Sequence, residues 1–223
     1  MSDALPAAGQ TQTLLLDGPA GRLEVQINAP AAPAADSGFA VVCHPHPLFG
    51  GALGNKVTYT LASCAQKAGL YALRFNFRGV GRSEGRHDEG RGETDDTVFL
   101  AGWLRERLPR GPLLLAGFSF GAWVSVAAAA RVRPTAQVSI APPFAKYFGD
   151  APPPPRPPCP WLVVHGRDDE VVPYEETVIA LKTYDPPPQL VTLDRVGHFF
   201  HNKLAELSEV VLPFVREHVG APG

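Results

Sequence analysis

The amino-acid sequence predicts an α/β fold: a mostly parallel central sheet of about eight strands with helices on both faces. Strand-like apolar runs alternate with helix-like segments along the chain, which is typical of β-α-β units. From residue 39 onward the runs are continuously apolar, as expected for strands covered on both faces. With 45% hydrophobic and 19% charged residues, a chain of 223 residues can bury such a sheet. We therefore expect a single domain spanning 1–223.

The expected strands are short runs rich in Leu, Val, Ile or Ala. In chain order they are "TLLLDG" around Leu14, "RLEVQINA" from Arg22, "FAVVCHP" from Phe39, "LYALRFNF" from Leu70, "PLLLAGF" from Pro112, "AQVSIA" from Ala136, "WLVVHG" from Trp161 and "QLVTLDRV" from Gln189. Only the short link "DGPAG" joins the first two, so they should form an antiparallel hairpin at one edge.

Helical patterns lie between the strands. Asn55 can cap "KVTYTLASCAQKAG", which Gly69 ends, and "ETDDTVFLAGWLRERLP" has acids in its first turn and arginines near its end. Three more follow, "GAWVSVAAAARV", "YEETVIALKTY" and "KLAELSEVVLPFVREHV". Pro213 lies inside the last pattern and is expected to kink or split that helix, because proline cannot donate the i to i−4 hydrogen bond.

Composition narrows the classes of function and the compartment. A formal net charge of −2 gives no general attraction to nucleic acid or to an anionic membrane. Three cysteines without CxxC spacing favour a reducing compartment, and no apolar run approaches the ~20 residues that span a bilayer. The first residues lack the basic and apolar regions of a signal peptide. We expect a cytoplasmic protein; the oligomeric state does not follow from the sequence.

The stretch "GFSFG" places Ser119 between two glycines where a strand runs into a helix. Such a turn holds the serine in strained backbone geometry and lifts its hydroxyl above the sheet edge, and only bare glycines fit beside it. The helix that begins there presents N–H groups to a developing oxyanion. A tight structural turn with an incidental serine is the alternative.

A serine hydroxyl needs a base, and the base needs an orienting carboxylate. Asp168 and Asp169 follow the strand from Trp161, and His198 follows the strand from Gln189. Because parallel strands deliver their carboxyl ends to one sheet edge, these groups should meet Ser119 there. The chain order Ser, Asp, His is the one expected of α/β-hydrolases.

The sequence resembles the α/β-hydrolase superfamily from Phe39 to Val219, and in particular small, lidless serine hydrolases of the dienelactone-hydrolase and carboxylesterase type. The resemblance rests on "GFSFG", "RFNFRGVGRSEG", "HGRDDEVVP" and "VGH". It implies Asp169 as the catalytic acid, with Asp168 as its rival, and His198 as the base. In "HPHPLFGG" it implies the backbone N–H of Leu48 as one oxyanion donor, with Phe49 as the fallback, beside the N–H of Phe120.

Other candidates have simpler interpretations. His44 and His46 form an HxH pair without a third ligand at metal-like spacing, so we expect loop structure or a cleft wall and no metal. His201 is a rival base, and His165 a structural hydrogen-bonding residue. Phe199 and Phe200 are equally suited to the core and to an acyl pocket, and Trp123 and Tyr147 are candidates for the cleft.

The expected reaction is hydrolysis of small or accessible carboxylic esters through an acyl-enzyme, without a cofactor. The proline-rich interval from Pro142 to Pro160 is too short and stiff for a lid of several helices, so an open cleft is expected. A thioesterase or a small peptidase would use the same three residues. A non-catalytic binding or scaffold protein of this fold is the alternative from another class.

Overall fold

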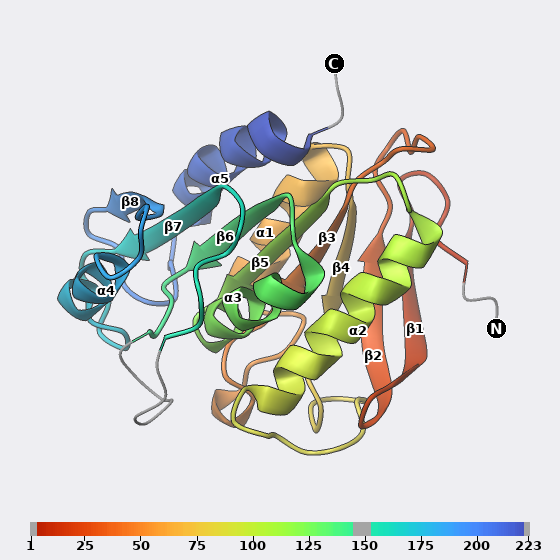
Figure 1. Ribbon diagram of the computed structural model, residues 1–223, viewed down its shortest axis with the longest axis horizontal. Helices are drawn as coiled ribbons and strands as arrows, with labels where there is room; N and C mark the ends of the chain where they lie inside the picture. Colours follow the sequence, from red (N-terminus) through yellow and green to blue (C-terminus); the bar gives the residue numbers. More distant parts are fainter. Residues whose placement is uncertain (1–3, 145–152, 221–223) are drawn as a thin grey trace.

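The computed structural model describes residues 4–144 and 153–220, which form one eight-stranded sheet between two layers of helices (Figure 1). The strands lie in the order β1-β2-β4-β3-β5-β6-β7-β8. Their bounds are β1 Thr11–Gly18, β2 Gly21–Asn28, β3 Phe39–Cys43, β4 Tyr71–Phe75, β5 Leu113–Phe118, β6 Ala136–Ile140, β7 Trp161–Gly166 and β8 Gln189–Leu193. The predicted strand number and the mostly parallel sheet are confirmed.

The hairpin lies at one edge, as the short link predicted. Thr11 faces Asn28 and Gly18 faces Gly21 in an antiparallel ladder. The second strand also pairs antiparallel with β4, whereas every pairing from β4 to β8 is parallel. The parallel strands therefore bring their carboxyl ends to a common edge, which is where loops carrying polar side chains can converge.

Helices cover both faces of the sheet. α1 (Lys56–Lys67) and α5 (Leu204–Val219) pack on one face, and α2 (Arg91–Arg107), α3 (Phe120–Val132) and α4 (Tyr174–Leu181) on the other (Figure 1). Successive side chains of a buried strand point to opposite faces of the sheet and therefore join different hydrophobic clusters. Val42 packs in the cluster that contains α1 and α5, and its neighbour Val41 packs in the cluster that contains α2 and α3. This two-sided burial explains the continuously apolar strand sequences.

Two predicted helix features have different outcomes. The side-chain oxygen of Asn55 accepts hydrogen bonds from the N–H groups of Val57 and Thr58 and caps α1 as predicted. Of the two outcomes expected at Pro213, a kink or a split, the split is contradicted, because α5 (Leu204–Val219) continues as one helix across that position. Pro213 and Glu209, whose carbonyl loses its helical donor, both face solvent, so water can satisfy that carbonyl.

The connection between β6 and β7 carries no helix in its described parts, 141–144 and 153–160. Tyr147, a candidate for the cleft, lies outside the described residues. The three cysteines are buried and unpaired with one another. None of the described helices is long and apolar enough to cross a bilayer.

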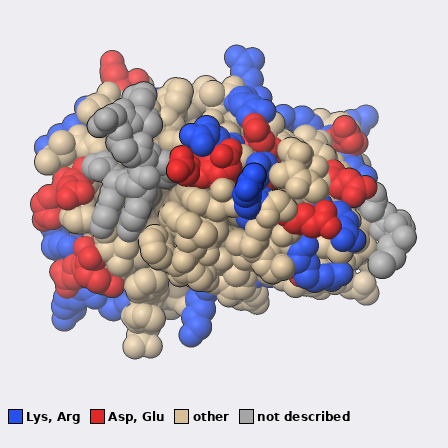
Figure 2. Space-filling view, turned by 90° about the horizontal axis from the view of Figure 1, so that it is seen from below, with Lys and Arg blue, Asp and Glu red and all other residues tan. Residues whose placement is uncertain are grey.

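The charged side chains are mixed in sign. On the face seen from below Figure 1, blue and red residues stand side by side around a region of uncharged residues (Figure 2). Exposed ion pairs of the protein include Arg22 with Glu84 and Arg167 with Asp194. Such pairs contribute little to stability, and their mixture gives this face no strong field of one sign.

Candidate active site

Ser119 occupies a sharp turn between β5 and α3. Its φ of 52° and ψ of −124° are strained for a residue with a side chain, and it is the N-cap residue of α3. A Cβ on Gly117 would collide with the carbonyl oxygen of Gly121, and a Cβ on Gly121 would collide with the carbonyl oxygens of Cys43 and His44. The two glycines are thus required by close backbone approach, as the sequence pattern predicted.

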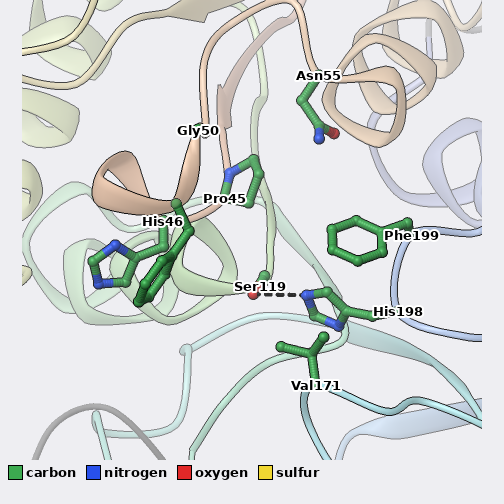
Figure 3. Close-up of a pocket in the computed structure, with 10 residues that line it drawn as sticks. Pro45, His46, Gly50, Asn55, Ser119, Val171, His198 and Phe199 are labelled. Atoms are coloured by element: carbon green, nitrogen blue, oxygen red, sulfur yellow. Dashed lines mark hydrogen bonds between the residues drawn. The ribbon is translucent and has the colours of Figure 1, made fainter.

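His198 and Asp169 lie against this turn. His198 Nε2 is 3.1 Å from Ser119 Oγ (Figure 3), and His198 Nδ1 is 2.8 Å from Asp169 Oδ2. The three side chains come from the loops after β5, β7 and β8, and all three residues are buried. The backbone N–H of His198 also donates to Glu170 Oε2 at 3.1 Å, which holds the histidine loop against the acid loop.

The Asp169 carboxylate is surrounded by donors. Its Oδ1 accepts from the N–H groups of Val171 at 2.9 Å and Val172 at 2.7 Å. Burial alone would raise the pKa of Asp169, but hydrogen bonds from His165 and His198 and the backbone donors prevail and hold the pKa below its usual range. The carboxylate is therefore ionised at neutral pH and can orient the imidazole of His198.

His165 reaches the same carboxylate from the end of β7. Its Nε2 is 2.9 Å from the carbonyl oxygen of Val172 and 3.4 Å from Asp169 Oδ2. Both partners are acceptors, so Nε2 carries the proton. The sequence predicted His165 as a structural hydrogen-bonding residue, and its proximity to Asp169 was missed. A histidine that ends a strand four residues before the acid is the signal that points to it.

The loop after β3 forms the opposite wall of the site. His44 is buried, with Nδ1 2.6 Å from the carbonyl oxygen of Pro45 and Nε2 accepting from the N–H of Phe77 at 3.0 Å. Burial lowers the pKa of His44 to about 3, so it is neutral. The pKa of His46 is also lowered by burial. No group of three or more potential ligands suited to a metal ion occurs among the described residues.

The structure places the two predicted oxyanion donors differently. Phe120 directly follows Ser119 as the first residue of α3 and is buried. Leu48 lies in the short helix Pro47–Phe49 with 70% of its surface exposed, and its N–H donates to His46 Nδ1 at 3.2 Å. Its N–H is engaged within the loop, and Leu48 is absent from the described residues that line the pocket. Phe49, the fallback, lines that pocket.

Ser119 and His198 lie in a pocket of about 400 Å³ (Figure 3). Its other walls include Pro45, His46, Phe49, Asn55, Val171 and Phe199. The size suits a small organic molecule.

The two adjacent phenylalanines have separate environments. Phe199 is 47% exposed and lines the pocket, whereas Phe200 is 1% exposed and packs in the core beneath α5. Trp123 lies on α3, packs against two of the core clusters and is not among the described residues that line the pocket. Asn55 was predicted only as a helix cap, and its place in the pocket wall was missed.

The rival residues lie apart from the network. Asp168 and His201 are exposed, and neither has a hydrogen bond to Ser119 or His198 among the described residues. Cys43 is buried beside Thr97, and burial raises the pKa of its thiol to about 12. A thiol with a raised pKa is a poor nucleophile, so Ser119 is the nucleophile candidate best supported by its surroundings.

Known proteins are similar to this chain in fold and in sequence. Residues 40–142 match the family described as alpha/beta hydrolase fold. An α/β serine hydrolase without a lid from Xanthomonas campestris is 39% identical, with a TM-score of 0.89 and complete coverage of both chains. An uncharacterized protein from Rickettsia prowazekii is 32% identical over 210 residues, which cover 89% of this chain and 86% of the relative.

A more distant structure shares the fold. Est1E from Butyrivibrio proteoclasticus, with ferulic acid bound, is 19% identical, has a TM-score of 0.75, and covers 92% of this chain and 99% of its own. The nearly complete matches at 39% and 32% identity, together with the sheet topology and the turn at Ser119, establish the relationship. The chain belongs to the α/β-hydrolase family.

Proposed function

We propose that the protein is a serine hydrolase that cleaves small or accessible carboxylic esters through an acyl-enzyme. The observation that carries this proposal is the buried hydrogen-bonded chain from Ser119 through His198 to Asp169. Ser119 is the nucleophile, His198 the general base and then the general acid, and Asp169 the group that fixes the imidazole tautomer. The similarity to a lidless serine hydrolase supports this chemistry.

The reaction proceeds in two halves. Ser119 Oγ attacks the ester carbonyl as its proton passes to His198 Nε2, and the imidazolium then protonates the leaving alcohol oxygen. A water molecule attacks the acyl-enzyme, with His198 again taking a proton and returning it to Ser119. The reaction needs only water, and no cofactor takes part in either half.

The tetrahedral oxyanion needs donors aimed at the carbonyl oxygen. We assign the backbone N–H of Phe120, at the N-terminus of α3, as one of them. The second donor comes from the loop after β3. For Leu48 to serve, its N–H must leave His46 Nδ1 when substrate binds. Each donor of this kind contributes ~3 kcal/mol to stabilisation of the transition state.

Small esters are favoured by the shape and lining of the pocket. A volume of about 400 Å³ leaves room for a short acyl chain and a modest alcohol, and Phe49, Val171 and Phe199 provide apolar walls. Est1E, which shares the fold, has been solved with ferulic acid bound, a small carboxylic acid. We therefore propose a soluble ester of this size as the substrate and the cytoplasm as the location of the protein.

A fluorophosphonate probe and a panel of esters test the proposal together. Wild-type protein should be labelled covalently and Ser119→Ala should not, because the probe reacts with an activated serine. Oxygen and thiol esters of increasing acyl length, with a short peptide amide, then separate esterase, thioesterase and peptidase activity. Equal labelling of both proteins would contradict the assignment of Ser119 as the nucleophile. No turnover of any ester would instead favour a binding or scaffold protein.

A further inference from the structure

Asn55 has a polar group that its structural role does not use. Its side-chain oxygen accepts from the N–H of Val57 at 2.9 Å and of Thr58 at 3.2 Å, so the cap of α1 occupies the oxygen alone. The amide nitrogen Nδ2 has no hydrogen-bond partner among residues 4–144 and 153–220. It is also not a buried atom, so it is open to whatever fills the space beside it.

That space is the pocket above Ser119. Asn55 belongs to the pocket wall, with its carboxamide end directed into the cavity between the loop of Pro45 and the side chain of Phe199 (Figure 3). The cap fixes the orientation of the carboxamide, because a flip would turn Nδ2 toward two N–H donors. Nδ2 is therefore a pre-oriented donor that faces the substrate space.

The chemistry of the pocket limits what this donor can bind. A donor pairs with an acceptor atom of a ligand. The pocket-lining residues include no lysine or arginine, and burial lowers the pKa of His46, which is then neutral at pH 7. A carboxylate or phosphate would be desolvated there without a counter-charge, so an uncharged oxygen is the better partner. The apolar walls accommodate the carbon chain that carries it.

We propose that Asn55 is a specificity-determining residue whose Nδ2 donates a hydrogen bond to a second, uncharged oxygen of the substrate, on its acyl or its alcohol part. The preferred substrates are then small esters that bear an ether, carbonyl or hydroxyl oxygen in addition to the scissile ester. This inference rests on the proposed ester hydrolysis at Ser119 and names the substrate class of that site.

Variants that keep the cap isolate the donor. Serine and aspartate cap helices about as well as asparagine, so Asn55→Ser and Asn55→Asp should keep the melting temperature of the wild type. Both lack the NH₂ group. Asn55→Ala removes cap and donor together and serves as the destabilised control, which shows how much activity a loosened α1 costs.

Isosteric pairs of esters measure the interaction. The acyl arm compares p-nitrophenyl 3-methoxypropanoate with p-nitrophenyl pentanoate, and the alcohol arm compares 2-ethoxyethyl acetate with pentyl acetate. In at least one arm the wild type should favour the oxygen-bearing ester in kcat/KM. Asn55→Ser and Asn55→Asp should lower kcat/KM for that ester by roughly threefold to tenfold relative to its hydrocarbon partner, as expected for the loss of one neutral hydrogen bond. 4-Acetoxybutanoate, which carries a carboxylate, should be a poorer substrate than pentyl acetate.

Several results would overturn the assignment. An equal fall for both members of a pair would show that Asn55 acts only through the loop that it caps, and the absence of any wild-type preference in both arms would remove the subsite. A preference for the carboxylate would contradict an uncharged partner. These results differ from failure of the proposed function, in which the wild type hydrolyses none of the esters and the Asn55 assignment falls with the reaction.

Discussion

Two buried histidines at the same edge of the sheet have contrasting surroundings. His44 directly follows β3 and forms hydrogen bonds only to the backbone, at Pro45 and Phe77. His198 follows β8 and forms hydrogen bonds to the side chains of Asp169 and Ser119. Burial holds His44 neutral, with a pKa of about 3, so that it cannot take up a proton at neutral pH. His198 has a carboxylate that can stabilise an imidazolium. The partner, rather than burial, decides which histidine can perform acid–base chemistry.

The contrast predicts that the residues which take part in the proton exchange lie on the loops after β5, β7 and β8, and that His44, after β3, has a structural role. The largest effect should come from Ser119→Ala, which removes the nucleophile and should lower kcat by about 10⁴-fold to 10⁶-fold. Steady-state hydrolysis of a p-nitrophenyl ester measures it, and circular dichroism should show an unchanged fold. Retention of most of the activity would mean that another residue attacks the ester.

Asp169→Asn should lower kcat by about 10⁴-fold, because an amide favours the wrong tautomer of His198. Asp168→Asn is the matched control, since Asp168 is the adjacent exposed carboxylate without a bond to His198 among the described residues. It should remain within about twofold of wild type, as is usual for exposed substitutions. The opposite ranking would transfer the role of the acid to Asp168.

Removal of the hydrogen bond from His165 should have a smaller effect. His165→Leu takes one donor from the Asp169 carboxylate and should lower kcat/KM roughly tenfold, the loss expected for a bond to a charged group. His165→Gln places an amide nitrogen near the position of Nε2 and should restore most of the activity. The pH profiles of kcat/KM for the two variants separate a role of His165 in positioning the Asp169 carboxylate from a simple loss of packing. Only a changed environment of that carboxylate shifts the acid limb of the profile. If glutamine is as damaging as leucine, the role is packing.

His44→Gln should change stability rather than chemistry. The pKa of His44 is lowered on folding, so the unfolded chain binds more protons between about pH 6.5 and the folded value of about 3. In the wild type this adds a fall of up to about 1.4 kcal/mol in unfolding free energy per pH unit as the pH drops through that window. Chemical denaturation at several pH values between 7 and 4 should show that the unfolding free energy of the variant falls less steeply with decreasing pH than that of the wild type.

The acid limb of kcat/KM should be the same for His44→Gln and wild type, because His198 alone exchanges the proton in the reaction. A shifted limb in the variant, or an unchanged slope of stability with pH, would contradict the assignment of His44 as a buried neutral residue.

Much of the fold follows from local patterns. The continuously apolar runs predicted the mostly parallel sheet, the short link predicted the hairpin at its edge, and Asn55 predicted the start of α1. Burial on two faces and local hydrogen bonding leave such signatures within a few residues. The sequence could not show that Pro213 leaves α5 unsplit, because its exposed position, which lets water satisfy the freed carbonyl, depends on packing rather than on local sequence.

By itself the sequence determined the sheet, the strained turn at Ser119 and the residue types gathered at one sheet edge. Only the tertiary structure decided how these groups pair: that His165 shares the carboxylate of Asp169, that Leu48 N–H bonds to His46, and that the unused amide of Asn55 faces the pocket. The physical reason is the separation along the chain of the residues that interact. Backbone conformation and burial depend mainly on neighbouring residues, whereas a hydrogen bond about 3 Å long between two loops depends on where those loops meet in the folded chain.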